Sequence, residues 1–168
     1  MRIYGHFTTS VKKALYEIDP KYLEYRGVVI CGSHSPKDAN IADLLSTIQY
    51  AREHGTPILG ICFGYQLMAI EYARNVLGQE YATSEEFTKE GDHVVTKLPE
   101  LRVGLIDGES YWHRYEVNPG LIHIMLGDEN VATDRYMGVQ YHPEYQSSID
   151  KPHPILVNFL DICRNSGK

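Results

Sequence analysis

The sequence predicts an α/β fold: a mostly parallel sheet with helices on both faces, interrupted by a small β-rich insertion. In the first half of the 168 residues, short apolar runs alternate with longer runs whose apolar residues recur at helical spacing. The run at 58–61 is continuously apolar, as is typical of a strand covered on both faces. Around residues 88–135, short strand-like segments follow one another with little helix between them.

The first half is expected to alternate strands with helices. The predicted strands are a weak one at residues 3–7, a buried one at 27–31 and the apolar run at 58–61. A first helix is expected to have its N-cap in Thr8-Thr9-Ser10 and to end at Asp19-Pro20. Two further helices have apolar faces at 41–48 and 67–76, and the second of them ends at Gly78.

The second half is expected to be rich in strands and to end in a helix. The predicted strands lie at residues 94–96, 102–106, 122–125 and 137–141. Apolar residues spaced as on one helix face predict a C-terminal helix at 154–163. The length argues for one domain over residues 1–168, large enough to bury a core without disulfides or a structural metal.

The composition excludes several classes of protein. Sixteen Lys and Arg stand against 22 Asp and Glu, and an acidic surface with a net charge of −6 repels nucleic-acid phosphates. No run of roughly 20 apolar residues is present, so no membrane span is expected. The N-terminus has no apolar signal region, and three cysteines are an odd, sparse set that does not suit a disulfide framework. A cytoplasmic protein with free thiols is therefore expected.

The most informative segment is Gly60-Ile61-Cys62-Phe63-Gly64, where the apolar strand meets the long helix. Glycines two residues before and after a nucleophile are typical of a nucleophile elbow, a tight turn that lifts the side chain above the sheet. The helix N-terminus favours the reactive thiolate of Cys62, and the backbone N–H of Phe63 can donate to an oxyanion. The alternative interpretation is that Cys62 is a small core residue, the usual fate of an isolated cysteine.

A thiol nucleophile needs a base and an orienting group, and Tyr141-His142-Pro143-Glu144 offers both 80 residues downstream of Cys62. Strand ends of a parallel sheet converge at one edge, so His142 can meet Cys62 there. Pro143 keeps the segment extended, so that Glu144 can bond the far imidazole nitrogen of His142. Taken alone, the segment is more typical of a surface His-Pro turn. The other histidines and the cysteines have no metal-ligand spacing, so neither a metal nor another cofactor is expected.

Gly-Ile-Cys-Phe-Gly-Tyr-Gln at 60–66 and Val-Gln-Tyr-His-Pro-Glu at 139–144, in that order and at that separation, resemble the class I (triad) glutamine amidotransferases. Within that family the sequence is most similar to the glutaminase domain of CTP synthase. The resemblance covers residues 27–148 and is supported by the segments 48–53, 70–78, 82–87 and 113–118. It implies a flavodoxin-like fold of the amidotransferase type.

The resemblance implies a mechanism and a set of binding residues. Cys62 attacks the side-chain amide of glutamine, His142 carries the proton to the departing ammonia, and Glu144 orients His142. The oxyanion lies between the N–H groups of Phe63 and of the Gly32-Ser33 turn. The residues implied to hold the α-amino and α-carboxylate groups of the substrate are Gln66, Glu86, Arg114 and Tyr115. Without the resemblance, Glu86 and Arg114 would be interpreted as surface charges.

Several features depart from the family pattern. Cys31-Gly32-Ser33 stands where the family usually has Pro-Gly-Gly, which bears on the strength of the oxyanion donors. His34-Ser35-Pro36-Lys37-Asp38 replaces an Arg- and Gly-rich loop associated with GTP activation in CTP synthase, so GTP regulation is not expected. The family has two strands and a helix before residue 27, where one strand and one helix are evident, and residues 14–18 are the alternative second strand.

The leading hypothesis is a free-standing enzyme that hydrolyses a γ-glutamyl amide. No Gly-rich ATP-binding loop followed by Lys-Ser/Thr is present, so the chain is not expected to make CTP by itself. Glutamine is the favoured substrate, with ammonia passing to a separate ATP-dependent synthetase subunit. The alternative substrate is a γ-glutamyl conjugate of a nucleotide or metabolite, because its α-amino and α-carboxylate groups are the same. A non-catalytic regulatory module is the third hypothesis, and the intact triad argues against it.

Overall fold

The computed structural model describes residues 1–33, 40–126 and 135–166. The predicted turn at 34–38 and the part of the predicted insertion at 127–134 lie outside the described residues. In chain order the elements are β1 (Arg2–Tyr4), α1 (Thr8–Ile18), η1 (Tyr22–Glu24), β2 (Val28–Ile30), α2 (Ile41–Glu53), β3 (Ile58–Ile61), α3 (Phe63–Asn75), β4 (Ala82–Ser84), β5 (Asp92–Ile106), β6 (Glu109–Val117), α4 (Pro119–Leu126), β7 (Tyr136–Val139), η3 (Pro143–Tyr145) and α5 (Pro154–Asn165).

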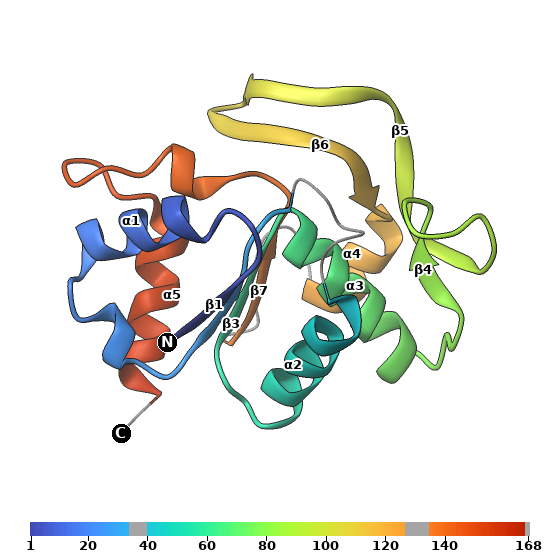
Figure 1. Cartoon of the computed structure of the whole chain (residues 1–168), viewed down its shortest axis with the longest axis horizontal. Helices are drawn as coiled ribbons and strands as arrows, with labels where there is room; N and C mark the ends of the chain where they lie inside the picture. The colour runs from blue at the N-terminus through green and yellow to red at the C-terminus, as the bar shows by residue number, and fades with distance from the viewer. Residues whose placement is uncertain (34–39, 127–134, 167–168) are drawn as a thin grey trace.

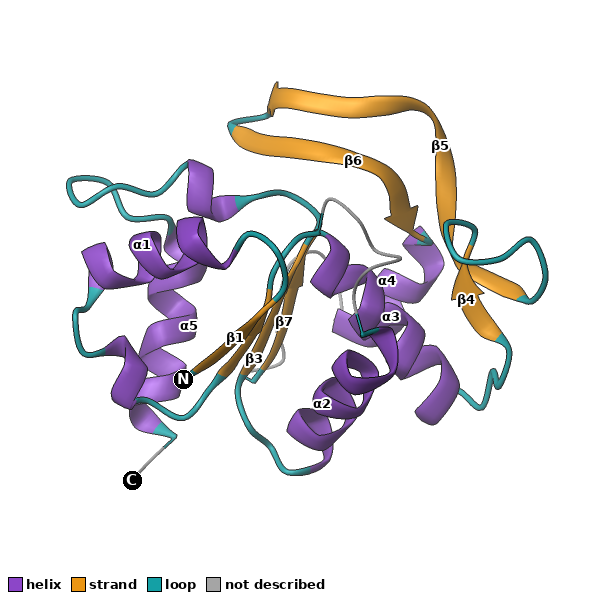
Figure 2. Cartoon of the chain, viewed as in Figure 1, coloured by secondary structure: helices purple, strands orange, loops and turns teal. Residues whose placement is uncertain are grey.

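A four-stranded sheet in the order β1-β2-β3-β7 forms the centre of the fold (Figures 1 and 2). All its neighbouring strands are parallel. Side chains alternate between its faces: Val28 and Ile30 pack with α2 and α3, whereas Val29 packs with α1 and α5. The predicted α/β fold with a mostly parallel sheet and helices on both faces is confirmed.

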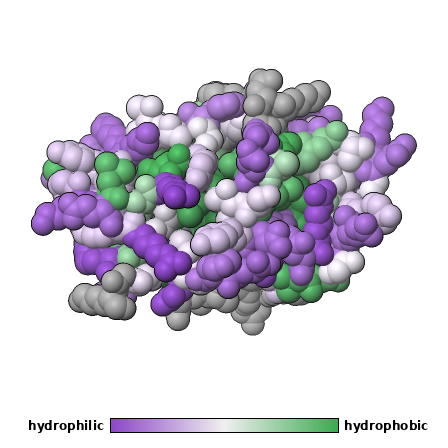
Figure 3. All heavy atoms as spheres, turned by 60° about the horizontal axis from the view of Figure 1, so that its bottom comes forward, coloured by the Kyte–Doolittle hydropathy of each residue, from purple (hydrophilic) through white to green (hydrophobic). Residues whose placement is uncertain are grey.

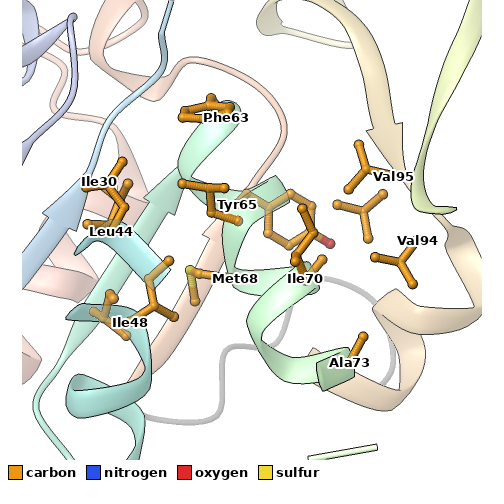
Figure 4. Packing of buried hydrophobic residues seen from close by; sticks show 14 of the residues in the cluster. Ile30, Leu44, Ile48, Phe63, Tyr65, Met68, Ile70, Ala73, Val94 and Val95 are labelled. Atoms are coloured by element: carbon orange, nitrogen blue, oxygen red, sulfur yellow. The ribbon is translucent and has the colours of Figure 1, made fainter. Parts of the chain in front are cut away.

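The core between the sheet and the helix pair α2–α3 surrounds α3. Figure 4 shows Ile48 of α2, Tyr65 and Met68 of α3, and Val94 and Val95 of β5 packed in one cluster. Ten of the thirteen residues of α3 are buried, because the sheet covers one side of the helix and the β-rich part of the chain covers another. The helix that follows Cys62 is therefore held on several sides.

The β-rich insertion forms a second sheet, β4-β5-β6, in which β5 and β6 make an antiparallel hairpin. The strands predicted at 94–96 and 102–106 are one long strand. Its register with β6 shifts between Lys97 and Arg102, on either side of Pro99, which has no N–H to donate. Strand β6 was not predicted, although Asp107-Gly108 is a typical two-residue hairpin turn and both residues have positive φ.

The prediction of a strand at 122–125 was wrong, because these residues belong to helix α4. Pro119 takes the first helical position, where its missing N–H costs nothing. The side-chain oxygen of Asn118 accepts from the N–H of Gly120 at 2.9 Å and so caps the helix. A short apolar run fits a strand and a buried helix equally well, and the preceding Asn-Pro decides between them.

The N-terminal boundaries also differ from the prediction. The first strand is Arg2–Tyr4 rather than residues 3–7, because Gly5 turns the chain with a φ of 111°. Helix α1 already begins at Thr8, so the predicted N-cap lies inside it, and Phe7 precedes it without a side-chain cap. Residues 14–18 belong to α1 and form no additional strand.

The face shown in Figure 3 is largely hydrophilic, with apolar residues gathered towards its middle. Among the described residues, no helix combines the length and apolar character needed to cross a membrane. Cys31, Cys62 and Cys163 are all free and buried.

Candidate active site

Cys62 occupies the sharp turn between β3 and α3. Its backbone has φ 52° and ψ −105°, a conformation that costs a non-glycine residue on the order of 1–3 kcal/mol. The turn needs both flanking glycines. A Cβ at Gly60 would lie 2.5 Å from the sulfur of Met68, and a Cβ at Gly64 would overlap the carbonyl oxygen of Ile30. The predicted elbow is therefore present in its geometry.

Strand register brings His142 to Cys62. Ile61 pairs with Val139 across β3 and β7, and the N–H of Cys62 donates to the carbonyl of Val139 at 2.8 Å. Each strand then leaves the sheet at its carboxyl end, one into α3 and the other into the His142 segment. The thiol and the imidazole line the same cavity, close enough for Cys62 to raise the pKa of His142.

Glu144 holds the other side of the imidazole. Its Oε1 lies 2.9 Å from His142 Nδ1, and His142 is only 2% exposed. Burial lowers the pKa of His142, but the hydrogen bonds with Cys62 and Glu144 outweigh burial and raise that pKa to about 10. The rings of Phe7 and Tyr145 stand 5.6 and 5.4 Å from the imidazole. This arrangement favours an imidazolium beside the Cys62 sulfur at neutral pH.

The predicted oxyanion residues lie at the same place. Phe63 is the first residue of α3, so its N–H has no partner within the helix. Gly32 lies against the imidazole, where a Cβ would come within 2.8 Å of His142 Cε1. Its carbonyl accepts from the N–H groups of His6 and Phe7, and Ser33 Oγ lies 2.8 Å from His6 Nδ1. The Gly32-Ser33 turn is thus fixed next to the candidate base.

A cavity of about 590 Å³ opens above Cys62, and all the predicted site residues except Gly32 and Glu144 line it. Gln66 Nε2 donates to the carbonyl of Tyr115 at 2.7 Å, which joins two of the predicted binding residues. Arg114 lies at the cavity wall, with its guanidinium donating to the carbonyl of Pro99 at 2.9 Å. Glu86 is half-buried, and its N–H donates to Ser84 Oγ at 3.1 Å.

Strand β6, which carries the predicted binding residues Arg114 and Tyr115, forms a wall of this cavity, although the strand itself was not predicted. The Cys62 thiol donates to the carbonyl of Trp112 at 3.7 Å, and the N–H of His142 donates to the carbonyl of Ser110 at 2.7 Å. Gln140 Nε2 also donates to the Cys62 sulfur at 3.7 Å. Backbone carbonyls carry no residue-type signature, so only the Asp-Gly hairpin signal could have pointed to this strand. Other lining residues that were not predicted are Phe7, Leu101, His113 and Tyr145.

His113 is a neutral histidine within this wall. Burial lowers its pKa to about 4, against the hydrogen bond to Tyr115, which raises it. A carbonyl can only accept, so Nδ1 carries the proton and donates to the Tyr115 oxygen at 2.9 Å. His113 and Gln66 therefore converge on one carbonyl and fix the backbone of β6 beside the cavity.

A larger cavity, of about 840 Å³, lies at the opposite end of the sheet, beside Arg2, Val28 and Thr56 at the amino-terminal ends of the strands. It contains none of the predicted catalytic residues. Over the described part of the chain, no group of three or more His, Cys, Asp or Glu could hold a metal ion. The candidate active site is therefore the cavity at Cys62.

Cys62 is expected to react with limiting iodoacetamide roughly tenfold or more faster than the other two thiols at neutral pH. Burial raises the pKa of Cys31 far above its ordinary value and that of Cys163 to about 12, whereas Cys62 lines the cavity. Mass-spectrometric mapping of the first modified peptide checks this. In urea all three thiols should react at similar rates, and labelling of Cys31 or Cys163 first in the native chain contradicts the expectation.

Comparison with known proteins identifies relatives of this chain. A family profile described as "Glutamine amidotransferase class-I" matches residues 6–162. CTP synthase of Methanoculleus marisnigri is 34% identical over 183 residues, covering 83% of this chain and 34% of that protein. CTP synthase of Encephalitozoon cuniculi is 32% identical over 186 residues, covering 84% and 34%. The chain thus spans about a third of the length of the curated relatives that it matches.

Solved structures share the fold. The glutaminase domain of Trypanosoma brucei CTPS, with bound acivicin, matches with a TM-score of 0.77 at 19% identity, covering 98% of this chain and 94% of that one. A protein described as a GMP synthase subunit, from Thermoplasma acidophilum, matches with a TM-score of 0.60 at 19% identity, covering 99% and 96%. The family profile spans the elbow, the His-Pro-Glu segment and the strands that join them, and the chain therefore belongs to the class I glutamine amidotransferases.

Proposed function

We propose that this chain hydrolyses γ-glutamyl amides, with glutamine as the favoured substrate, through a catalytic triad of Cys62, His142 and Glu144. One observation carries the proposal: a thiol on a strained elbow lines the same cavity as a histidine that is hydrogen-bonded to a buried glutamate. Such an arrangement is suited to nucleophilic attack on an amide followed by proton transfer to the leaving nitrogen. Membership of the amidotransferase family supports the same chemistry.

In the proposed reaction, the Cys62 thiolate adds to the side-chain amide carbon, and the carbonyl oxygen takes up the negative charge. The N–H groups of Phe63 and of the Gly32-Ser33 turn donate to this oxyanion. His142, as the imidazolium, gives its proton to the nitrogen as the C–N bond breaks and ammonia leaves. A water molecule that His142 deprotonates then adds to the γ-glutamyl thioester, and glutamate departs as the thiolate re-forms.

The other end of the substrate is an amino acid zwitterion, and the cavity offers groups of both charges. Arg114 binds the α-carboxylate and Glu86 the α-ammonium group, since these two side chains line the cavity together with Gln66. Gln66 and Tyr115 are already joined by a hydrogen bond, so they present a preformed surface to the substrate. Preformed contacts reduce the entropy that binding must overcome.

The ammonia acceptor is, in our proposal, an ATP-dependent synthetase in a separate subunit. The relatives named CTP synthase are about three times longer than the stretch they share with this chain, which is consistent with a synthetase partner. Residues 1–168 act as one domain in this scheme. Three free cysteines suit the cytoplasm as its compartment.

A γ-glutamyl conjugate is the second candidate substrate, and the surroundings of His142 favour it. The leaving group departs beside this residue, where the rings of Phe7 and Tyr145 provide apolar surface. A cavity of about 590 Å³ also falls in the range that holds ligands larger than an amino acid. A conjugate with an apolar amine therefore has room on the side where glutamine has only its amide nitrogen.

Steady-state release of glutamate from glutamine and from γ-glutamyl conjugates tests the proposal. Release from glutamine supports the glutaminase, and release from conjugates alone supports the second candidate. If neither substrate is cleaved by the folded chain, alone or with a co-purified partner, the amide hydrolase is wrong and the regulatory module is favoured.

Arg114→Lys is expected to lower kcat/KM by roughly tenfold to a hundredfold. A point charge cannot reproduce the planar, two-pronged contact with a carboxylate, and such a contact contributes on the order of 1.5–3 kcal/mol. The thermal midpoint should change little, because Arg114 makes only an exposed bond to a backbone carbonyl. Arg135→Lys is a matched control, since Arg135 also donates from the surface to a backbone carbonyl, that of Gly55. Wild-type kcat/KM in Arg114→Lys and Arg114→Ala would remove Arg114 from the binding site.

A further inference from the structure

The hairpin of β5 and β6 reaches across the carboxyl ends of the sheet strands towards the segment that precedes α5 (Figure 1). A two-stranded ribbon is at best marginally stable in water, so the outer part of the hairpin depends on contacts with the rest of the protein. The apolar residues Leu101, Val103 and Leu105 on that part of β5 are exposed. The contacts of the hairpin with the segment before α5 come from β6.

Alternate residues of β6 face the protein and contact the segment between β7 and α5. His153 Nε2 donates to both carboxylate oxygens of Glu109, at 3.1 and 3.0 Å. Next along this side of the strand, the ring of Tyr111 meets that of Tyr141, which also lies against the imidazole of His153. Glu109 thus ties the start of β6, directly after the hairpin turn, to the start of α5.

His153 is fixed in this role by its second ring nitrogen. Nδ1 accepts from the N–H of Ile155 at 3.3 Å and so caps α5, which leaves the proton on Nε2, facing Glu109. The residue is only 8% exposed, and its backbone N–H donates to Ser147 Oγ at 3.1 Å. Because both ring nitrogens of His153 are hydrogen-bonded, its imidazole is held in one orientation beside Glu109.

We propose that Glu109 and His153 are positioning residues, whose hydrogen bond latches the hairpin where β6 forms the wall of the active site. Trp112 and Tyr115, whose carbonyls accept from Cys62 and Gln66, lie three and six residues beyond Glu109 on the same strand. At about 3.3 Å per residue, the contact with the nucleophile is roughly 10 Å from the latch. Loss of the latch therefore lets this wall move. The kinetic consequence of the latch rests on the proposed function, whereas its structural consequence does not.

Two variants separate the latch from the helix cap. His153→Asn keeps a residue that caps helices well but is too short to reach Glu109, and Glu109→Met keeps the length of the side chain but removes both oxygens that accept from His153. In both we expect the KM for glutamine to rise roughly fivefold to tenfold, with kcat changed less than about twofold. The backbone amides of 109–117 should exchange faster with deuterium. Trp112, the single tryptophan of the chain, should show lower fluorescence anisotropy.

Asp107→Asn is the control, because it removes a carboxylate from the exposed turn of the same hairpin, at a positive φ that asparagine tolerates. This variant should change neither the KM for glutamine nor the rate at which the backbone amides of 109–117 exchange with deuterium. The double variant of Glu109 and His153 should be no worse than the worse single variant, because both changes remove one shared bond.

Unchanged exchange of β6 in both single variants overturns the latch, whatever the activity. Faster exchange with an unchanged KM overturns the positioning role. If the wild-type chain releases no glutamate from any substrate, the proposed function fails, and the exchange and Trp112 measurements still decide whether the latch exists.

Discussion

Replacement of Cys62 by glycine is expected to reduce glutamate release from glutamine by roughly 10⁴-fold or more, while the fold becomes more stable than that of Cys62→Ala. The catalytic loss follows because neither variant has an atom that can form the thioester. The stability difference follows because Cys62 has a φ of 52°, which glycine adopts without the steric cost that alanine bears. We expect the glycine variant to exceed the alanine variant by about 1 kcal/mol.

Glutamate release and thermal unfolding of the same preparations check both parts of this prediction. Cys163→Ala is the control for thiol removal, since Cys163 is a buried residue of α5 that packs in the core with α1 and should be dispensable for activity. Activity within tenfold of wild type in Cys62→Gly would rule out the nucleophile. A lower midpoint for the glycine than for the alanine variant would rule out backbone strain at the elbow.

Gly64→Ala is expected to destabilise the fold by about 3 kcal/mol or more. A Cβ at this position would overlap the carbonyl oxygen of Ile30 and lie 2.7 Å from its carbonyl carbon. These are backbone atoms of β2, so relief requires α3 to move away from the sheet rather than a side chain to rotate. For a chain of this size, the midpoint should fall by roughly 6–12 °C.

Gly120→Ala provides the matched control, because Gly120 lies in α4 and its nearest neighbour to a new Cβ is the side chain of Asn118, at 3.4 Å. Alanine should be neutral or slightly stabilising there, since it favours helix. If the thermal midpoint of Gly64→Ala equals that of the wild type, β2 and α3 are not in close contact.

The sequence predicted the sheet and the elbow because both depend on local patterns. A continuous apolar run followed by Gly-x-Cys-x-Gly has few structural solutions, and β3 and α3 are where that pattern places them. The His142 segment was predictable because it follows another apolar strand, and neighbouring parallel strands deliver their ends to one edge.

Strand β6 was harder to predict than the central sheet, since it is mostly half-exposed and rich in polar residues. Strand β6 carries Glu109, His113 and Arg114, which break the apolar alternation that marks a strand. Its functional contacts use backbone carbonyls, such as that of Trp112, which no residue pattern reveals. Glu86 and Arg114 likewise have no local signal, because their place at the cavity depends on how a distant sheet folds over α3.

The elbow and the His142 segment meet through adjacent strands, although the whole hairpin lies between them in the chain. The entropic free-energy cost of closing the loop between two paired strands grows only with the logarithm of the loop's length, by about 0.6 kcal/mol for each doubling. Insertions or deletions in the hairpin therefore leave the pairing of Ile61 with Val139 almost untouched. The length of the hairpin can therefore change, and with it the rim that selects which amide enters, at little cost to the sheet, provided that β6 keeps its contacts with Cys62 and His142.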